Sequence, residues 1–467
     1  MTTPELATSI GEALVTAPEI AFALPPETPE ASVDPLFRLL GAPLIVRTLR
    51  QLQDAGVQNS VVVLPERWRA AEAAVKSDFR ITHRTTFHFY GGTLPAETAL
   101  MRAAAALSGP AFICRSDWVS PAAYLKALAA KPLEVEARLA IAPTSSRWEA
   151  AETYQEDERW RVRLPKGVRR PFEGAGLISK GLLTRLQESG GRLIDALDQA
   201  AQAGGVEWTT VDSSWGLAVG RRADIADAEK RLLNALRKPI DGVISRTINR
   251  NISIPISRYL ANTPVTPNMA SASTLLFAFV AVWMVTHGGY WWMLLGAALF
   301  QFASIVDGVD GELARLKYQF SKYGEWIDTV IDDISNFSFF AALTYAIFQG
   351  RAEPGWLWVL GVLTLACYAV ITPLMYSYII LYTKSGDVMA IDYEFNKSDS
   401  LQDNRFVVRF MAALKYVAKR DFFIFMIFVF ALFGKLPYML IPAGLGAAII
   451  LSTVAKQHLR KRRETTG

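Results

Sequence analysis

Several residue types are scarce in this 467-residue chain, and each scarcity removes a class of protein from consideration. Only two cysteines are present, Cys114 and Cys367, so neither a disulfide framework nor a cysteine-based metal site is expected. Lysine and arginine (49) barely outnumber aspartate and glutamate (44), and no basic face with interleaved aromatics appears. We therefore expect no nucleic acid partner. The N-terminus lacks a basic region followed by an apolar core, which argues against a cleaved signal peptide.

Charge is also missing from long stretches of the second half of the chain. Trp291 to Ile305 and Ile334 to Phe348 contain no charged residue at all, whereas the first 235 residues have an ordinary mixed composition. The fold class predicted from this contrast is a soluble α/β domain followed by an all-α transmembrane domain of six helices. We expect an irregular N-terminal segment, the soluble domain, an interfacial amphipathic helix and the membrane domain at residues 1–34, 35–235, 236–262 and 263–467, respectively.

Short apolar strands alternate with helical patterns in the soluble part. Apolar residues recur with a helical period from Leu44, and Gly56 is expected to end that helix. A second helix is expected from Gly191 to Ala203. Such alternation predicts an open α/β sheet, with strand candidates at Ser60–Leu64, Ala111–Cys114, Arg138–Ala142 and Gly176–Ile178.

Six membrane spans can be drawn in the second half, at residues 270–286, 290–306, 326–348, 356–382, 422–433 and 436–454. The fifth has only about a dozen apolar residues, which is short for a span, so its start could extend into residues 416–421. The three loops on one side of these spans contain only Arg351 and Lys435 as lysine or arginine residues. The positive-inside rule therefore places both termini and the soluble domain in the cytoplasm, with the bacterial inner membrane as the expected location.

The segment before the first span, residues 236–262, mixes basic residues with an apolar stripe. This composition is typical of a helix lying on an anionic membrane surface, so membrane lipids are expected partners. An ordinary surface helix of the soluble domain is the alternative.

Four aspartates interrupt the apolar second half: Asp307, Asp310, Asp328 and Asp332. Spacings of three and four residues place each pair on one face of a helix. Carboxylates at membrane depth are costly, so they imply paired charges, a cation or a water-filled cavity. Hard oxygen ligands favour Mg²⁺ or Mn²⁺, and Gly311 beside them would let a ligand approach the backbone.

Other uses of these acids are weaker. The alternating oxygens and terminal glutamate of an EF-hand calcium loop are missing. An intramembrane aspartyl protease would need two aspartates, whereas four acids with Arg315 nearby suit a phosphate-bearing ligand better. A proton relay or a non-enzymatic cation carrier stays open as an alternative, although neither needs the Gly-x-x-Ala-Arg segment.

The spacing Asp-x-x-Asp-Gly-x-x-Ala-Arg, eight residues, Gly-x-x-x-Asp-x-x-x-Asp runs without a gap from Asp307 to Asp332. It resembles the signature of the CDP-alcohol phosphotransferase family, and the resemblance extends over residues 236–460. It implies transfer of a phospho-alcohol group from a CDP-linked alcohol donor to a hydroxyl acceptor, either a lipid or a polyol phosphate, with release of CMP. It also implies that the four aspartates bind two Mg²⁺ or Mn²⁺ ions and that Asp332 is the base. Contacts to CDP would come from Gly311, Arg315 and Ser321.

Most of residues 20–235 resembles the sugar-phosphate nucleotidyltransferase family, which has a Rossmann-like fold. The matching residues include Gly41, Arg47 and the segments Pro43–Ile45 and Val211–Trp215. Members of that family hold nucleotide phosphates in a glycine-rich turn, but Ile20–Pro29 here contains prolines and no glycine. Asp117 could match a metal-binding aspartate. We expect a degenerate domain, with the CDP-alcohol made elsewhere.

The fusion of these two parts resembles bifunctional enzymes that make CDP-inositol and then a di-inositol phosphate. The alternative hypothesis is therefore a bifunctional enzyme whose N-terminal domain makes the CDP-alcohol from CTP. The segment Lys419-Arg420-Asp421 and Arg246 resemble residues of those enzymes, which implies that Arg246, Lys419 and Arg420 contact an acidic acceptor. The alternative for each is a basic side chain snorkelling at the cytoplasmic surface. A homodimer is compatible with the sequence.

Overall fold

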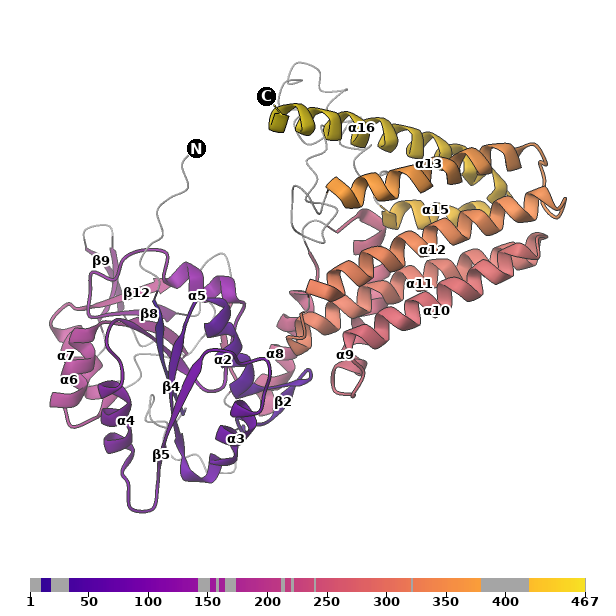
Figure 1. Ribbon diagram of the computed structural model, residues 1–467. Helices are drawn as coiled ribbons and strands as arrows, with labels where there is room; N and C mark the ends of the chain where they lie inside the picture. Colours follow the sequence, from indigo (N-terminus) through magenta and orange to yellow (C-terminus); the bar gives the residue numbers. More distant parts are fainter. Residues whose placement is uncertain are drawn as a thin grey trace. The chain divides into compact units, whose positions relative to one another are not determined.

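The structure is a computed structural model that describes residues 10–17, 33–141, 152–156, 159–163, 174–210, 215–219, 222–238, 241–320, 322–378 and 420–466 (Figure 1). It contains two compact units, Met1–Leu232 and Leu233–Gly467.

A seven-stranded sheet forms the centre of the N-terminal unit, in the order β12-β8-β11-β6-β1-β4-β5 (Figure 1). β11 is antiparallel to both of its neighbours, and every other pair in this sheet is parallel. The bounds are β1 Glu12–Thr16, β4 Asn59–Pro65, β5 Arg84–Tyr90, β6 Ala111–Arg115, β8 Ala137–Ile141, β11 Ala175–Ile178 and β12 Val206–Thr210.

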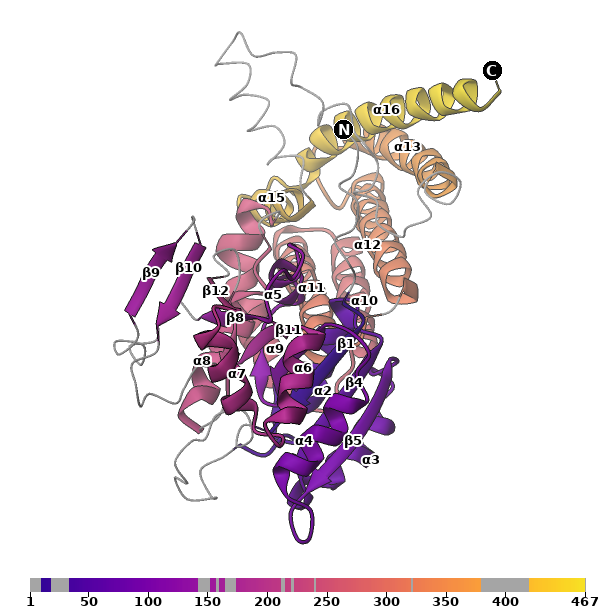
Figure 2. The same ribbon diagram turned by 90° about the vertical axis from the view of Figure 1, so that its left-hand side faces the viewer.

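Helices cover both faces of this sheet because successive strand residues point to opposite sides. In β1, Leu14 joins one buried cluster while Ala13 and Val15 join the other. The first cluster includes residues of α4 Ala96–Ala105, α6 Lys180–Glu188 and α7 Leu193–Gln202; the second includes residues of α2 Leu44–Asp54, α3 Ala70–Lys76 and α5 Ala122–Leu128 (Figure 2). The predicted open α/β sheet is confirmed.

Smaller elements complete this unit. Gly56 follows α2 with φ +107°, a conformation that suits glycine, so the predicted helix stop is confirmed. Two-stranded pairings join β2 Arg38–Leu39 to β3 Ala42–Pro43, β7 Trp118–Val119 to β13 Leu217–Ala218, and β9 Glu152–Glu156 to β10 Arg159–Arg163. The remaining helices are η2 Glu66–Trp68 and α8 Arg222–Asn234.

The C-terminal unit is helical throughout its described parts. A π-helical segment, η4 Ser245–Asn249, leads into α9 Arg250–Ala261. The long helices that follow are α10 Pro267–Thr286, α11 Tyr290–Lys317, α12 Lys322–Phe348 and α13 Leu357–Tyr378. The last elements are α15 Arg420–Leu432, η9 Leu436–Met439 and α16 Leu440–Thr466.

Among the described residues, four helical stretches are long and apolar enough to cross a membrane: Pro267–Thr286, Tyr290–Lys317, Leu357–Ser377 and Leu436–Ala455. The six spans drawn from the sequence are therefore matched only in part. α12 carries Asp328, Asp332 and Asp333 in its first half, and α15 has only 13 described residues. Charge in one helix and length in the other explain why both fall outside the set.

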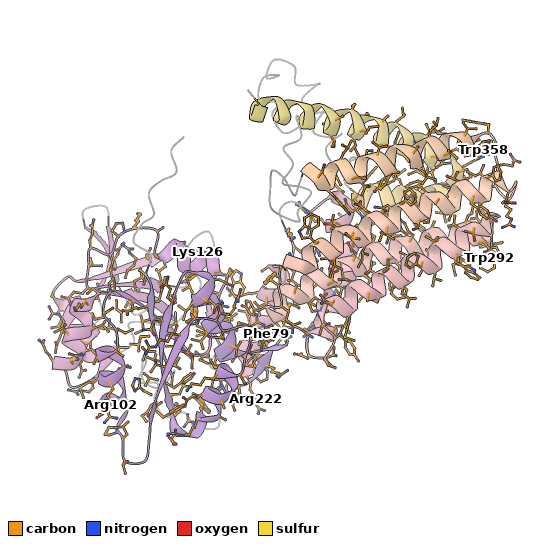
Figure 3. All side chains as sticks on the ribbon, viewed as in Figure 1. Phe79, Arg102, Lys126, Arg222, Trp292 and Trp358 are labelled. Carbon is orange, nitrogen blue, oxygen red and sulfur yellow. The ribbon has the colours of Figure 1, made fainter. Side chains whose placement is uncertain are left out.

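A single apolar core joins the long helices. α10 packs against both α11 and α12, and Phe300 of α11 stacks on Phe339 of α12 with ring centroids 4.4 Å apart. Near the C-terminal end of α10, a ring cluster is formed by Trp283, His287 and Trp292, the last of which belongs to α11. Trp292 and Trp358 lie at the same end of the helical unit (Figure 3). Tryptophans of this kind gather at membrane–water boundaries, and the aspartates lie at the opposite ends of these helices.

Candidate functional site

Asp307 and Asp310 lie inside α11, three residues apart and therefore on one face of that helix. The helix continues past them to Lys317 and ends where Tyr318 adopts a left-handed conformation with φ 54°. Asp328 and Asp332 lie four residues apart near the start of α12. Both pairs thus sit close to the turn that connects the two helices.

Ser271 of α10 joins one aspartate from each of these helices. Its Oγ lies 2.6 Å from Asp310 Oδ2 and 3.1 Å from Asp328 Oδ1. Asp310 is only 6% exposed. Because a hydroxyl has one hydrogen, Ser271 can donate to only one of the two carboxylates at a time. A neutral hydroxyl offsets no charge, so this contact brings two carboxylates together without neutralising them.

Arg420, at the start of α15, joins the other two aspartates. Its Nη1 lies 3.1 Å from Asp307 Oδ2 and also forms an ion pair with Asp332 Oδ2. Two carboxylates thus share one guanidinium. The second oxygen of Asp332, Oδ1, is buried and has no hydrogen-bond partner in the described part of the chain. A buried carboxylate oxygen without a donor is costly unless a cation or a substrate group approaches it.

These donors fit a hard divalent cation in chemistry, since all of them are carboxylate oxygens. As arranged, the acids form two bridged pairs. Within the described ranges, no group of three or more acidic, histidine or cysteine side chains is already gathered around one point. The orphaned Asp332 Oδ1 and the doubly shared Arg420 and Ser271 are the features that fit bound cations.

Gly311 and Arg315 lie one helical turn apart on α11 beside the acids. A Cβ built on Gly311 would meet only Arg315 Nη2, at 4.0 Å, so space is open there. Arg315 is half-buried, and its Nε has no hydrogen-bond partner among the residues that the structure describes. A guanidinium in this position suits a phosphate oxygen.

Two of the predicted site residues, Ser321 and Lys419, lie outside the described residues. Of the predicted acceptor contacts, Arg246 is exposed in η4 and Arg420 pairs with Asp307 and Asp332.

Asp421 lies next to Arg420, in the segment expected to hold an acidic acceptor. Its Oδ2 accepts a hydrogen bond of 2.7 Å from the backbone N–H of Ser245. A Cβ on Gly242 would lie 2.3 Å from the same carboxylate, so only glycine fits there. At the start of α15, Arg420 therefore contacts Asp307 and Asp332, and Asp421 contacts Ser245 at the beginning of η4.

Asp333 adjoins Asp332 but is occupied differently. It accepts hydrogen bonds from the hydroxyls of Tyr376, at 2.7 Å, and Tyr368, at 3.4 Å, both on α13. This acid therefore ties α12 to α13 and has its hydrogen-bonding needs met by the protein itself.

In the N-terminal unit, Asp117 follows β6 at the carboxyl end of the sheet. The strand order reverses between β1 and β6, and ligands of open α/β sheets bind beside such a point. Arg115, however, holds Asp117 with two hydrogen bonds, Nε to Oδ1 at 2.8 Å and Nη2 to Oδ2 at 2.6 Å. The two side chains are 7% and 2% exposed, respectively, so the charge of Asp117 is neutralised inside the fold.

Trp118 fills space next to this pair. A Cβ on Gly174 would lie 1.8 Å from its ring, and one on Gly216 would lie 2.1 Å from it. The indole therefore lies between two glycine backbones and is only 5% exposed. Burial also raises the pKa of the nearby Cys114 thiol, which leaves it protonated and unreactive at neutral pH. Ile20–Pro29, expected to replace a phosphate loop, lies outside the described residues.

The chain is similar to several known proteins. Residues 264–455 match the family model of CDP-alcohol phosphatidyltransferase. The bifunctional IPC transferase and DIPP synthase of Aquifex aeolicus is 28% identical over 425 residues, covering 87% of this chain and 88% of that protein. The protein of the same name from Thermococcus kodakarensis is 28% identical over 355 residues, covering 73% and 77%.

Among solved structures, the inositol-1-phosphate CTP transferase from T. maritima is similar to 48% of this chain and 97% of its own, with 17% identity and a TM-score of 0.37. The family match and the enzyme relatives identify the protein as a transferase with a CDP-alcohol phosphatidyltransferase domain in its C-terminal half. The predicted family resemblance is confirmed.

Proposed function

We propose that the C-terminal unit moves a phospho-alcohol group from a CDP-alcohol to an acceptor hydroxyl and releases CMP. The observation that carries this proposal is the pairing of Asp310 with Asp328 at Ser271 and of Asp307 with Asp332 at Arg420. Each pair joins α11 to α12, and a donor with a charged pyrophosphate suits such a place.

The four aspartates would hold two Mg²⁺ or Mn²⁺ ions. Bound there, such ions supply charge stabilisation for the pyrophosphate and for the leaving CMP oxygen. Gly311 and Arg315, with Ser321, would bind the CDP moiety, since Arg315 can donate to a phosphate oxygen across the open space at Gly311.

Asp332 is the proposed general base. Its Oδ1 is buried and without a donor among the described residues, so it can accept the proton of an approaching hydroxyl. Arg420 holds the other oxygen of the same carboxylate and thereby orients it. With Lys419 and Arg246, Arg420 would also attract an acidic acceptor.

The relatives suggest the substrate class. Both are named bifunctional IPC transferase and DIPP synthase, and the resemblance to enzymes that make CDP-inositol and a di-inositol phosphate favours a CDP-linked polyol as donor and a phosphorylated polyol as acceptor. A lipid hydroxyl is the other acceptor that this reaction class allows, and product mass would distinguish the two.

The proposed setting is a multi-pass domain with α12 and α15 as additional spans, giving six. The tryptophans at one end of the helices and the charged residues at the other support this orientation in a bilayer. We propose that the aspartates face the cytoplasm.

A second candidate function concerns the N-terminal unit. The match to the Aquifex relative extends over 87% of this chain, and this favours a unit that makes the CDP-alcohol from CTP. The internal Arg115–Asp117 pair favours a unit without this activity, so that another protein supplies the donor. Incubating the full chain with CTP and inositol phosphates decides between them, because cytidylyl transfer releases pyrophosphate.

The transfer itself is tested by incubating the purified full chain with a panel of CDP-alcohols, phosphorylated polyols and lipids in Mg²⁺. CMP release and a product mass equal to donor plus acceptor minus CMP are expected. Lack of CMP release with every donor and acceptor pair would overturn the proposal.

A further inference from the structure

Glu312 is a fully buried acid that lies between Asp310 and Arg315 in the sequence of α11. The proposed transfer chemistry does not use it. Its side chain is 0% exposed. It accepts hydrogen bonds from Arg250 Nη1 at 2.6 Å, Ser253 Oγ at 2.7 Å and Ser257 Oγ at 2.5 Å. All three donors belong to α9, so one carboxylate fixes this helix to α11.

The donors lie on the inward face of α9, at spacings of three and four residues. Arg250, Ser253 and Ser257 are buried, whereas Ile252 and Tyr259 on the outward face are 41% and 78% exposed. The helix therefore turns its polar stripe toward the protein. Hydrogen bonds to Glu312, rather than apolar packing alone, hold it there.

Gly308 makes this approach feasible. A Cβ at this position would lie 3.3 Å from Arg250 Nη1, closer than ordinary van der Waals contact. Gly308 and Glu312 are four residues apart on α11 and therefore face α9 together. Gly308, within the aspartate motif, is thus a contact site for Arg250.

Arg250 also reaches Asp241, with Nε to Oδ2 at 3.1 Å and Nη2 to Oδ1 at 3.2 Å. Burial opposes ionisation of Asp241, but hydrogen bonds from Arg250 and the Lys238 amide hold the pKa of Asp241 below its usual value. Arg250 thus lies between two carboxylates and links the segment before η4 to α11.

Glu312 is two residues after Asp310 and three before Arg315. With about 100° of rotation per residue, Glu312 faces away from Asp310, while Arg315 lies between these two directions. Fixing Glu312 against α9 therefore sets the rotation of α11 about its axis. That rotation decides where both the aspartates and Arg315 point.

We infer that Glu312 and Arg250 are a positioning pair for the transfer reaction, which aims Arg315 at the CDP donor by fixing α11 against α9. This inference rests on the proposed function. Neither side chain touches a reacting atom; the pair acts through Arg315.

The test is a double-mutant cycle in the full chain, with Glu312→Gln, Arg250→Gln and the double variant, assayed by CMP release. Glu312→Gln leaves Arg250 paired with Asp241 alone, and Arg250→Gln leaves both Glu312 and Asp241 without their arginine, so each should raise the donor KM by about tenfold or more. The acceptor KM should stay within about twofold, because the pair lies on the Arg315 side of α11. The double variant should recover at least about threefold of the donor KM relative to Arg250→Gln, since the buried charge of Glu312 is gone while Asp241 lacks its arginine in both variants.

Glu353→Gln is the matched control, because Glu353 lies in the loop between α12 and α13, beyond the opposite ends of the helices. It should leave both KM values unchanged. Thermal unfolding of all four variants measures the pair without any activity and should give the same non-additive pattern.

In an active wild type, a donor KM within about twofold of wild type for Glu312→Gln would overturn the positioning role. So would equal rises in the donor and acceptor KM, which indicate general loss of structure, or single effects that simply add. A wild type that releases no CMP with any donor would instead overturn the proposed function, and the positioning role with it.

Discussion

Two aspartates, one in each unit, have opposite surroundings. Asp117 in the N-terminal unit receives both hydrogen bonds of its own arginine, and both side chains are nearly inaccessible. Asp332 in the C-terminal unit shares Arg420 with Asp307 and retains a buried oxygen without a donor in the described ranges. One acid is satisfied by the fold, and the other is left able to accept a ligand or proton.

The difference shows that an acid at a suitable place in a fold is not sufficient for catalysis. Arg115 lies two residues before Asp117 and neutralises it, and Trp118 fills the adjoining space. In the C-terminal unit one guanidinium is shared by Asp307 and Asp332, and a neutral hydroxyl joins Asp310 to Asp328, an arrangement of carboxylates that suits cations. Chemistry is therefore expected where a carboxylate keeps an oxygen for a ligand.

Metal removal should have the largest effect, abolishing the activity of the C-terminal unit while leaving the N-terminal unit unchanged. Treatment with EDTA is expected to abolish CMP release, and Mg²⁺ or Mn²⁺ should restore it, because four carboxylates must be offset before a pyrophosphate can approach. Hydrogen exchange in β1 and β6 should stay unchanged throughout. Full CMP release in EDTA, or slower hydrogen exchange in β6 on addition of Mg²⁺, would contradict the contrast between the two units.

Replacing Arg315 tests the phosphate side of the C-terminal site. Arg315→Gln removes a charge-assisted hydrogen bond worth about 1.5–3 kcal/mol, so the donor kcat/KM should fall about 10- to 100-fold. Arg351→Gln, in the loop between α12 and α13, is the matched control and should leave it unchanged. Equal effects of the two changes would remove Arg315 from the site.

Ser271→Ala tests whether the Ser271 hydroxyl orients the two acids that it bridges. Loss of the hydroxyl between Asp310 and Asp328 should weaken Mn²⁺ binding by about tenfold, measured by electron paramagnetic resonance. Ser273→Ala is the control, because among the described residues the Oγ of Ser273 bonds to the backbone oxygen of Ala270 and to no aspartate. If both variants bind Mn²⁺ like wild type, Ser271 does not orient the acids.

The smallest expected effect is a pH dependence in the N-terminal unit. His83 lies between Ser60 and Gln53, and burial, aided by the charge of Arg50, lowers the pKa of His83 to about 4. Its unfolded value is 6.5, so its contribution is complete above that pH and is lost as pH falls toward 4. Hydrogen exchange in β4 and β5, corrected for intrinsic rates, should show this loss. An equal loss in His83→Gln would assign the effect to other groups.

Much of the fold followed from periodicity. The strands Ser60–Leu64 and Ala111–Cys114 and the helix from Leu44 are present because apolar spacing and Gly56 determine them locally. Composition does not give the number of spans, since α12 combines an apolar second half with acids in its first half. Apolar content alone does not decide whether such a helix crosses the bilayer.

The aspartate motif was recognisable because its residues lie close in sequence on two helices. Ser271 and Glu312 were not, since their importance comes from contacts to helices 39 to 62 residues away. Serine in an apolar span is ordinary in composition, and only the fold places its hydroxyl between two carboxylates. The roles of Ser321 and Lys419 stay predictions.

The central claim is tested most directly by measuring CMP release from Asp117→Asn and Asp332→Asn side by side, each as the full chain in Mg²⁺. Loss of the proposed base should lower kcat by about 10²- to 10⁴-fold in Asp332→Asn. Asp117→Asn should keep the wild-type rate at a temperature where it stays folded. Wild-type CMP release by Asp332→Asn, or its loss in folded Asp117→Asn, would contradict the account.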